Sequence, residues 1–297
     1  MILFLVVKKL HLYLCVEKTI FIINPNSAKG QYQQFINNLS KLVENPNIFI
    51  SKSKEECYDF IKSNFNRYDI FIAVGGDGTI SSISEQLLFS DKILGVYPMG
   101  SGNGFARDNN FGSNVQNLVS KIKNGQSKSI DSIKIGDYLS INVSGIGLDS
   151  EVAYNFEKTS RGLWNYVKVT FMTFFKFKGI KVKFEDAYKK YDGDYFMVNI
   201  ANTKQFGNNA FIAPQAKIDD GKADIVLVKQ TPVYLAPKFV YQLFTQNLKE
   251  NRFLSFLKVT ECELSIDSDL WHIDGDAQII ASPVKIKIQP ESLRILV

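Results

Sequence analysis

A glycine-rich turn carries the residues of this chain that are best suited to bind phosphate. The segment 75–79 (GGDGT) follows an apolar run at 69–74 that is typical of a buried strand, and it precedes residues with helical spacing at 80–88. Glycines permit positive φ and let a ligand approach the backbone closely. The start of the following helix would present unpaired N–H groups, which bind anions. We therefore expect a phosphate site, with Asp77 placed to hold Mg²⁺ or polarise a nucleotide. The alternative is a tight turn that Asp77 only caps.

Two further loops rich in turn-forming residues follow predicted strands in the same half of the chain. The loop 24–30 (NPNSAKG) follows an apolar strand at 18–23, and the loop 98–104 (PMGSGNG) follows another at 93–97. Segments with helical spacing alternate with these strands, at 31–43, 55–65 and 113–123. This alternation predicts a mostly parallel sheet, and ligands bind beyond the carboxyl ends of such strands. All three loops would lie together at that edge.

The chain changes character near Asn124-Gly125, where strand-like segments become frequent. We expect 129–135 and 139–146 to form a hairpin, followed by a helical interval at 150–175. Later segments read as three strands and a final helix, at 181–185, 195–201, 223–228 and 232–248. The pattern predicts a second domain of antiparallel β type.

The composition argues against several kinds of site. The net charge is only +5 and no dense block of Lys and Arg occurs, so nucleic-acid binding is not expected. The three cysteines have no metal-binding spacing and indicate a reducing compartment. Two histidines supply a zinc site or a Ser-His-Asp triad poorly, and His272 is expected to be structural. No apolar run reaches the ~18–20 residues needed to span a bilayer.

One segment of the second half, 164–178 (WNYVKVTFMTFFKFK), is both aromatic and cationic. It is consistent with a lipid-facing surface whose lysines extend toward the headgroups. The alternative is a helix packed into the core, which is the more frequent origin of an aromatic stripe.

Six motifs occur in a fixed order along nearly the whole chain from Lys18. They are NPNSAKG at 24–30, GGDGT at 75–79, PMGSGNGFAR at 98–107, GIGLD at 145–149, PQAKIDDG at 214–221 and IDGD at 273–276. The ordered set resembles the diacylglycerol kinase and sphingosine kinase superfamily, particularly the soluble bacterial lipid kinases. The resemblance implies a Rossmann-like α/β nucleotide-binding domain at 1–125, to which a tail near 289–297 returns. It also implies a β-sandwich-like lipid-substrate domain at 126–288.

The resemblance also implies the residues of the nucleotide site. ATP would be bound by residues of the three loops, by the start of the helix after the glycine turn and by Ser51: Asn24, Pro25, Asn26, Ser27, Ala28, Ser51, Gly75, Gly76, Asp77, Gly78, Thr79, Ile80, Ser81 and Ser101. Lys29 and Arg107 would supply positive charge near phosphates or the lipid interface; the alternative for both is ordinary surface charge. Phosphoryl transfer needs positioning and charge neutralisation more than covalent help, which agrees with these residue types.

The resemblance assigns a metal and a general base to the second half. Asp220 and the carbonyls of Lys217 and Lys222 would hold Mg²⁺ with oxygen ligands, although Asp-Asp-Gly is also an ordinary turn sequence. Asp276 stands where the family usually has glutamate and would take the proton from the lipid hydroxyl, so Asp77 and Asp276 are the catalytic candidates. A second departure is Gly104, where many diacylglycerol kinases carry aspartate.

These residues together predict an ATP- and Mg²⁺-dependent kinase of a lipid alcohol, such as a diacylglycerol or a sphingoid base. We expect a cytoplasmic enzyme that contacts the inner membrane face transiently, binds no nucleic acid and could form a homodimer. Two alternatives remain open. One is a kinase of a soluble acceptor, since NAD kinases share the glycine turn. The other is a catalytically weak nucleotide-binding regulatory protein. Its support is that Gly104 and Asp276 both differ from the residues usual in the family.

Overall fold

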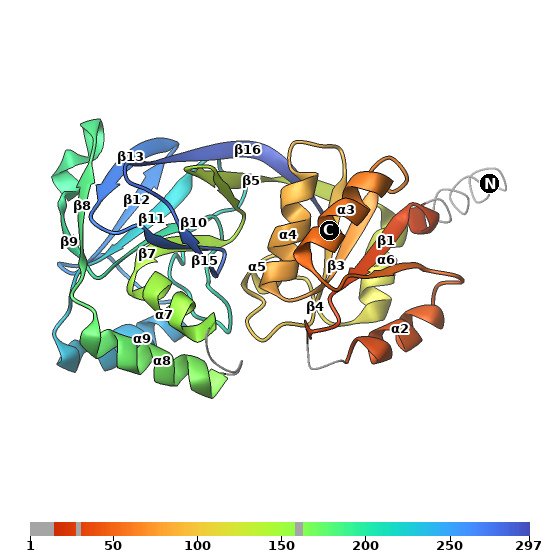
Figure 1. The fold of residues 1–297 in the computed structure, drawn as a ribbon, viewed down its shortest axis with the longest axis horizontal. Coiled ribbons are helices and arrows are strands. Elements are labelled where there is room, and N and C mark those ends of the chain that lie inside the picture. The colour runs from red at the N-terminus through yellow and green to blue at the C-terminus, as the bar shows by residue number, and fades with distance from the viewer. Residues whose placement is uncertain (1–14, 28–30, 158–162) are drawn as a thin grey trace. The chain divides into compact units, whose positions relative to one another are not determined.

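The computed structural model describes residues 15–27, 31–157 and 163–297 and divides the chain into two compact units (Figure 1). The N-terminal unit extends to Ile130 and also takes in Glu291–Val297. The C-terminal unit is Asp131–Pro290. The sequence pattern changes a few residues earlier, near Asn124-Gly125. The last strand, β16 (Val284–Leu296), contributes residues to both units.

A parallel sheet forms the centre of the N-terminal unit. Its strand order is β2-β1-β3-β4, and the end of β16 pairs with β4 in parallel at Arg294 and Ile93. Every residue of β1 and β3 is buried, as the continuous apolar runs of the sequence predict. The strand bounds are β1 Thr19–Ile23, β2 Asn47–Ile50, β3 Ile70–Gly75 and β4 Ile93–Pro98.

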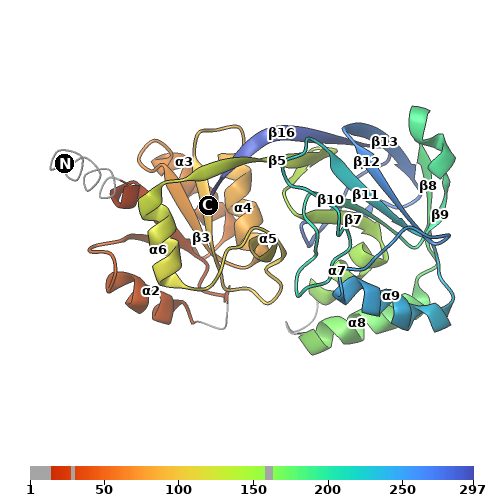
Figure 2. The same ribbon diagram turned by 180° about the vertical axis from the view of Figure 1, so that it is seen from behind.

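Helices cover both faces of this sheet. Figures 1 and 2 show α3 and α4 on one face and α2 and α6 on the other. Local sequence sets the helix ends: Ser53 accepts the N–H of Glu56 at the start of α3, and α6 stops at Gly125, whose φ is +64°. The bounds are α2 Tyr32–Ser40, α3 Lys54–Asn64, α4 Asp77–Leu87, α5 Gly104–Asp108 and α6 Val115–Asn124.

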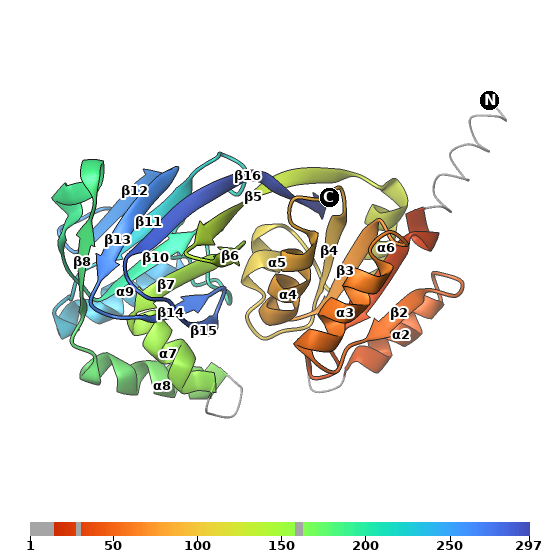
Figure 3. The same cartoon turned by 45° about the horizontal axis from the view of Figure 1, so that its top comes forward.

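The C-terminal unit is a sandwich of two sheets (Figure 3). One sheet is antiparallel with the order β12-β11-β10-β7-β14-β15, and the other joins the first part of β16 to β13, β8 and β9, with β5 and β6 beside it. Apolar side chains from both sheets, such as Trp271 and Phe184, make the core between them. The bounds are β5 Ser127–Ile135, β6 Tyr138–Ser140, β7 Val143–Gly147, β8 Ile180–Phe184, β9 Gly193–Tyr195, β10 Met197–Ala201, β11 Ala223–Val228, β12 Leu254–Val259, β13 Glu261–Ile266, β14 Leu270–Ile273 and β15 Asp276–Ile279.

The hairpin predicted for 129–135 and 139–146 is wrong in its second strand. Of the predicted second strand, the part that forms β6 pairs with β5, whereas β7 belongs to the other sheet. Between them, the N–H groups of Ile141 and Asn142 donate to the buried carboxylate of Asp274, each at 3.0 Å. Because these two donors are taken by a side chain, the strand is interrupted there and the chain passes to the second sheet.

The remaining α-helices pack against the sheet that contains β7 and β10. The predicted helical interval at 150–175 is two helices, α7 (Leu148–Glu157) and α8 (Leu163–Lys176). The helix predicted at 232–248 begins with a 3₁₀ turn, η3 (Val233–Leu235), continues as α9 (Ala236–Phe244) and ends at Thr245. A second 3₁₀ segment, η2, spans Asp186–Tyr191. In the described ranges, no helix is long and apolar enough to cross a membrane.

Candidate active site

Three loops meet at the carboxyl edge of the parallel sheet in the N-terminal unit. They follow β1, β3 and β4, as the sequence predicts, and backbone hydrogen bonds join them. The N–H of Asn24 donates to the Val74 carbonyl at 3.1 Å, and the N–H of Met99 donates to the Gly75 carbonyl at 2.7 Å. The loop segments therefore form one connected surface.

The glycine turn leaves the start of α4 open. Gly76 is the N-cap residue in extended conformation, and no side chain caps the helix. The turn is too tight for side chains: a Cβ on Gly75 would lie 2.5 Å from Thr79 Oγ1, and one on Gly100 would lie 2.6 Å from Gly76 Cα. A helix start without a capping side chain, lined by bare backbone, is a phosphate-binding arrangement.

Two side chains lock the loops to each other. Asp77 Oδ2 accepts the N–H of Asn103 at 2.7 Å, which links the β3 and β4 loops. Asn24 Nδ2 donates to Thr79 Oγ1 at 3.1 Å, which links the β1 loop to α4. Asp77 therefore positions the loop after β4, and its catalytic role stays a prediction.

Asn103 shapes the third loop. It adopts the left-handed conformation with φ +52°, and its amide both accepts from the Gly100 N–H at 2.9 Å and donates to the Gly100 carbonyl at 2.7 Å. The following Gly104 is buried at the start of α5. The exposed Arg107 is held by a hydrogen bond from its Nε to the Gly102 carbonyl at 3.1 Å. Arg107 therefore lies on the same loop cluster.

The other residues predicted to bind nucleotide differ in their exposure to solvent. Ser27 and Ser51 are buried, and the Ser51 hydroxyl donates to the Ser53 carbonyl at 2.7 Å. Asn26 and Ser101 are exposed. Ala28 and Lys29 lie outside the described residues. The structure thus brings the loops of Asn24–Ser27, Gly75–Ser81 and Ser101 to one sheet edge, while their roles toward ATP remain predictions.

Asp276 lies in the turn between β14 and β15 of the C-terminal unit. Asp274 and Gly275 form a two-residue hairpin with φ of +50° and +100°, and Asp276 follows as an exposed residue paired with Ile273. Its neighbour Asp274 has the opposite environment: it is buried and accepts from the hydroxyl of Ser140 at 2.5 Å. Asp274 therefore anchors the hairpin, and the exposed carboxylate of Asp276 remains the candidate base.

A buried polar cluster behind this hairpin was not identified as a site from the sequence. His272 Nε2 lies 2.9 Å from Asp149 Oδ2, and Asn199 Nδ2 donates to the same oxygen. Gly145 is needed beside it, because a Cβ there would lie 2.4 Å from Asp149 Oδ2. In the sequence, only the GIGLD motif and His272 pointed to this cluster. The structure shows that Asp149 of the motif contacts His272. The cluster ties β14 to α7 and so supports the strand that precedes Asp276.

The predicted metal site at Asp220 does not fit a divalent cation. Lys258 Nζ lies 2.7 Å from Asp220 Oδ2 and 3.3 Å from Asp224 Oδ2, so one ammonium already pairs with both carboxylates. Burial alone would lower the pKa of Lys258, but both carboxylates together raise it, so the lysine stays charged. The Lys222 N–H donates to Asp220 Oδ1 at 3.2 Å. Among the described residues, no group of three acidic, His or Cys side chains could hold a metal.

We expect Lys258→Met to lower the stability of the folded protein and to create a dependence on divalent cations. The side chain of Asp224 is only 4% exposed, and it would lose its counter-ion at a cost of about 3 kcal/mol. The wild-type melting temperature should be the same in EDTA and in Mg²⁺, whereas the variant should be stabilised by Mg²⁺. Lys285→Met is the control, because its pair with Glu261 is exposed and worth little. A wild-type protein destabilised by EDTA would contradict this account.

The structure thus consists of a parallel α/β unit with an open glycine turn, followed by a β-sandwich unit. Two family models match successive parts of the chain: the diacylglycerol kinase catalytic domain at 18–135, and the YegS C-terminal NAD kinase beta sandwich-like domain at 142–297. The second alone covers more than half of the 297 residues. The chain belongs to this family, which confirms the resemblance and the lipid kinase class.

Individual proteins agree with the family match. Proteins named diacylglycerol kinase are 24% identical over 220 residues in Staphylococcus aureus and 25% identical over 219 residues in Staphylococcus epidermidis. These matches cover 71% and 70% of this chain and 70% and 69% of the relatives. The crystal structure of a diacylglycerol kinase from Bacillus anthracis has a TM-score of 0.72 at 18% identity, covering 94% of this chain and 96% of that one. At this identity it confirms the fold: an α/β unit followed by a β-sandwich-like unit.

Proposed function

We propose that this lipid kinase transfers the γ-phosphate of ATP to the hydroxyl of a diacylglycerol or a similar membrane lipid. The observation that carries the proposal is the uncapped start of α4, set among loops that hydrogen bonds hold in place. Phosphates of ATP would accept from the backbone N–H groups of this turn. Hydrogen bonds between the loops hold this turn in place, which supports a role in anion binding.

The reaction assigns complementary roles to the two units. The lipid oxygen forms a bond to the γ-phosphorus, the bond from that phosphorus to the β-phosphate oxygen breaks, and ADP leaves. Asp276 takes the proton of the lipid hydroxyl as the new bond forms. ATP enters as its Mg²⁺ complex, in which the ion neutralises phosphate charge. Because the ion belongs to the substrate, this role is independent of Asp220.

The site of action follows from the two substrates. ATP is a substrate of the cytoplasm, and the acceptor lies in a membrane, so the reaction takes place at the cytoplasmic membrane face. The described cysteines, Cys15, Cys57 and Cys262, are free thiols, as suits a reducing compartment.

A panel of acceptors tests the proposal. The protein is incubated with ATP, Mg²⁺ and, one at a time, diacylglycerol, sphingosine, ceramide and NAD, and ADP release is measured for each. We expect ADP release to rise with at least one lipid alcohol and to need a divalent cation. A rise with NAD alone would replace the proposal by a kinase of a soluble acceptor. No rise with any acceptor would favour a regulatory protein.

A further inference from the structure

The hairpin that carries Asp276 has a short backbone connection to the rest of its sheet. Strand β15 is the last strand in the order of this sheet and pairs with β14. The ladder from β14 to the next strand, β7, spans two residue pairs and ends at His272 and Gly145. Asp276 lies opposite Ile273, one residue beyond that ladder. Side-chain contacts are therefore needed to fix the end of the hairpin that bears the candidate base.

Three successive residues supply these contacts. Ile273 is buried in the core between the two sheets. His272 points to the opposite face, because successive residues of a strand alternate, and its Nε2 lies 2.9 Å from Asp149 Oδ2. Asp274, the first residue of the turn, accepts from the hydroxyl of Ser140 and from two backbone N–H groups. The hairpin is thus anchored through one apolar and two polar side chains.

The carboxylate that faces His272 is held in place by contacts of its own. Asp149 Oδ1 accepts the N–H of Ser150 at 3.0 Å, and Asn199 Nδ2 of β10 donates to Oδ2. The first turn of α7 is also seated by a small buried apolar cluster that includes Leu148. Asp149 therefore offers β14 a fixed point that belongs to α7 and β10.

The imidazole of His272 depends on this one carboxylate. Its side chain is only 4% exposed, and its Nδ1 is buried without a hydrogen-bond partner among the described residues. A buried polar atom without a partner costs free energy, so an apolar side chain would fill this position at lower cost. Histidine at position 272 therefore serves the contact with Asp149 rather than the packing.

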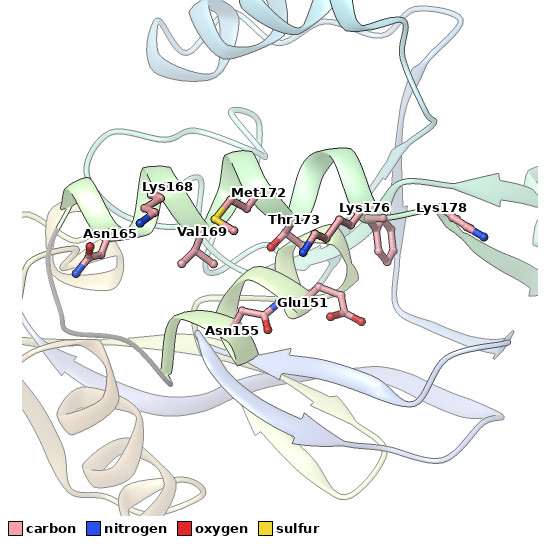
Figure 4. Close-up of a pocket in the computed structure, with 10 residues that line it drawn as sticks. Glu151, Asn155, Asn165, Lys168, Val169, Met172, Thr173, Lys176 and Lys178 are labelled. Carbon is pink, nitrogen blue, oxygen red and sulfur yellow. The ribbon is translucent and has the colours of Figure 1, made fainter.

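The contact is separate from the groove between α7 and α8. Figure 4 shows Glu151 and Asn155 of α7 at that groove, whose volume is about 550 Å³. Asp149 does not line the groove, and its side chain is only 10% exposed. The carboxylate of Asp149 is therefore turned toward the sheet and acts inside the C-terminal unit.

We propose that His272 is a positioning residue, which holds the β14–β15 hairpin so that Asp276 stays in place as the base. The inference rests on the proposed function, because Asp276 is a base only if the enzyme phosphorylates a hydroxyl. His272 is buried and acts through the hairpin rather than on a substrate. A displacement of about 1 Å in such a site can cost 100-fold in rate, so the loss of one anchor should lower turnover.

Steady-state kinetics of His272→Leu give the first test. We expect a turnover number about tenfold lower, with the lipid KM and the ATP affinity unchanged, because only the placement of the base is altered. His272→Gln should recover most of the rate, since its side-chain amide N–H can still donate to Asp149. A higher lipid KM at unchanged turnover would place His272 in acceptor binding and overturn the proposal.

Tyr195→Phe is the matched control. Tyr195 is buried in the other sheet of the same unit, and its hydroxyl donates to the Tyr191 carbonyl at 2.6 Å. The variant thus also loses one hydrogen bond of a buried side chain, but away from β14. It should have wild-type kinetics. An equal loss of turnover in Tyr195→Phe would show that general loosening of the unit is responsible, and would overturn the positioning role.

A double-mutant cycle separates positioning from a purely structural role. His272→Leu is introduced into Asp276→Asn, in which the base is already absent. We expect a further loss of less than about twofold, because there is no base left to position. A loss of about tenfold in both backgrounds would mean that His272 acts independently of Asp276, and would overturn the proposal.

Hydrogen exchange keeps this inference distinct from the proposed function, because it needs no substrate. We expect the amides of residues 270–279 to exchange at least tenfold faster in His272→Leu than in the wild type, and at the wild-type rate in Tyr195→Phe. Unchanged exchange in His272→Leu would overturn the proposal. If the wild type phosphorylates no acceptor, the proposed function and the catalytic part of this role fall together, and exchange still decides whether His272 anchors the hairpin.

Discussion

Asp276→Asn should lower the turnover number about 100-fold or more while ATP affinity stays nearly unchanged. The substitution keeps the shape of the exposed hairpin residue and removes the group that accepts the proton of the lipid hydroxyl. Asp276→Glu should keep clear activity, because it restores the carboxylate usual in this family. Steady-state kinetics with diacylglycerol and nucleotide binding by calorimetry measure the two quantities.

The control for this substitution is Asp269→Asn. Asp269 is also exposed and lies in the same unit, shortly before β14. It should have wild-type kinetics. If Asp276→Asn is as fast as the wild type, Asp276 is only a turn residue and another base must be sought. Because Asp274 holds Ile141 and Asn142, its substitution would disturb the fold and would not report on the base.

Asp77→Ala should also lower turnover on the order of 100-fold. The variant removes the acceptor of the Asn103 N–H and so frees the loop after β4 from the glycine turn. A displacement of about 1 Å in a site of this kind can cost 100-fold in rate. It also removes a negative charge from the start of α4. Melting temperature and circular dichroism should show that the fold is retained.

Asp77→Asn separates positioning from charge. Its amide oxygen can still accept the Asn103 N–H, so the loops should stay joined. We expect it to remain as slow as Asp77→Ala, because the predicted catalytic role needs the carboxylate. Recovery of the wild-type rate in Asp77→Asn would show that Asp77 acts only by holding the loop. Asp59→Ala, an exposed aspartate on α3, is the control and should be unchanged.

Local sequence was sufficient for the elements that make the N-terminal unit. The short apolar runs of β1 and β3 are buried strands, as their β-branched residues and flanking turn residues predict, and Ile80, Ile83 and Leu87 of α4 are buried as their spacing predicts. Turn-forming residues marked the loops after these strands. The position of these loops at the sheet edge could therefore be predicted before any tertiary contact was known.

The parts that could not be predicted depend on partners far away in the sequence. Asp274 breaks the expected hairpin from more than 130 residues away, and Lys258 reaches Asp220 across 38 residues. The spacing of apolar residues along the sequence does not predict such long-range contacts. For α8, apolar residues occur all around the helix, so spacing could not tell which face is buried. Phe174 packs on the core, as the alternative of a core helix predicted, whereas Phe171 and Phe175 are exposed.

The central claim is that the terminal phosphate of ATP moves to a lipid hydroxyl. Its most direct test uses ATP labelled at the γ-phosphate and, in a parallel reaction, at the α-phosphate, with diacylglycerol in mixed micelles and Mg²⁺. After extraction into organic solvent, we predict label in the lipid from γ-labelled ATP and none from α-labelled ATP. The lipid label should fall about 100-fold with Asp276→Asn. Label that stays in the aqueous phase for every lipid acceptor, with an active and folded preparation, would contradict the claim.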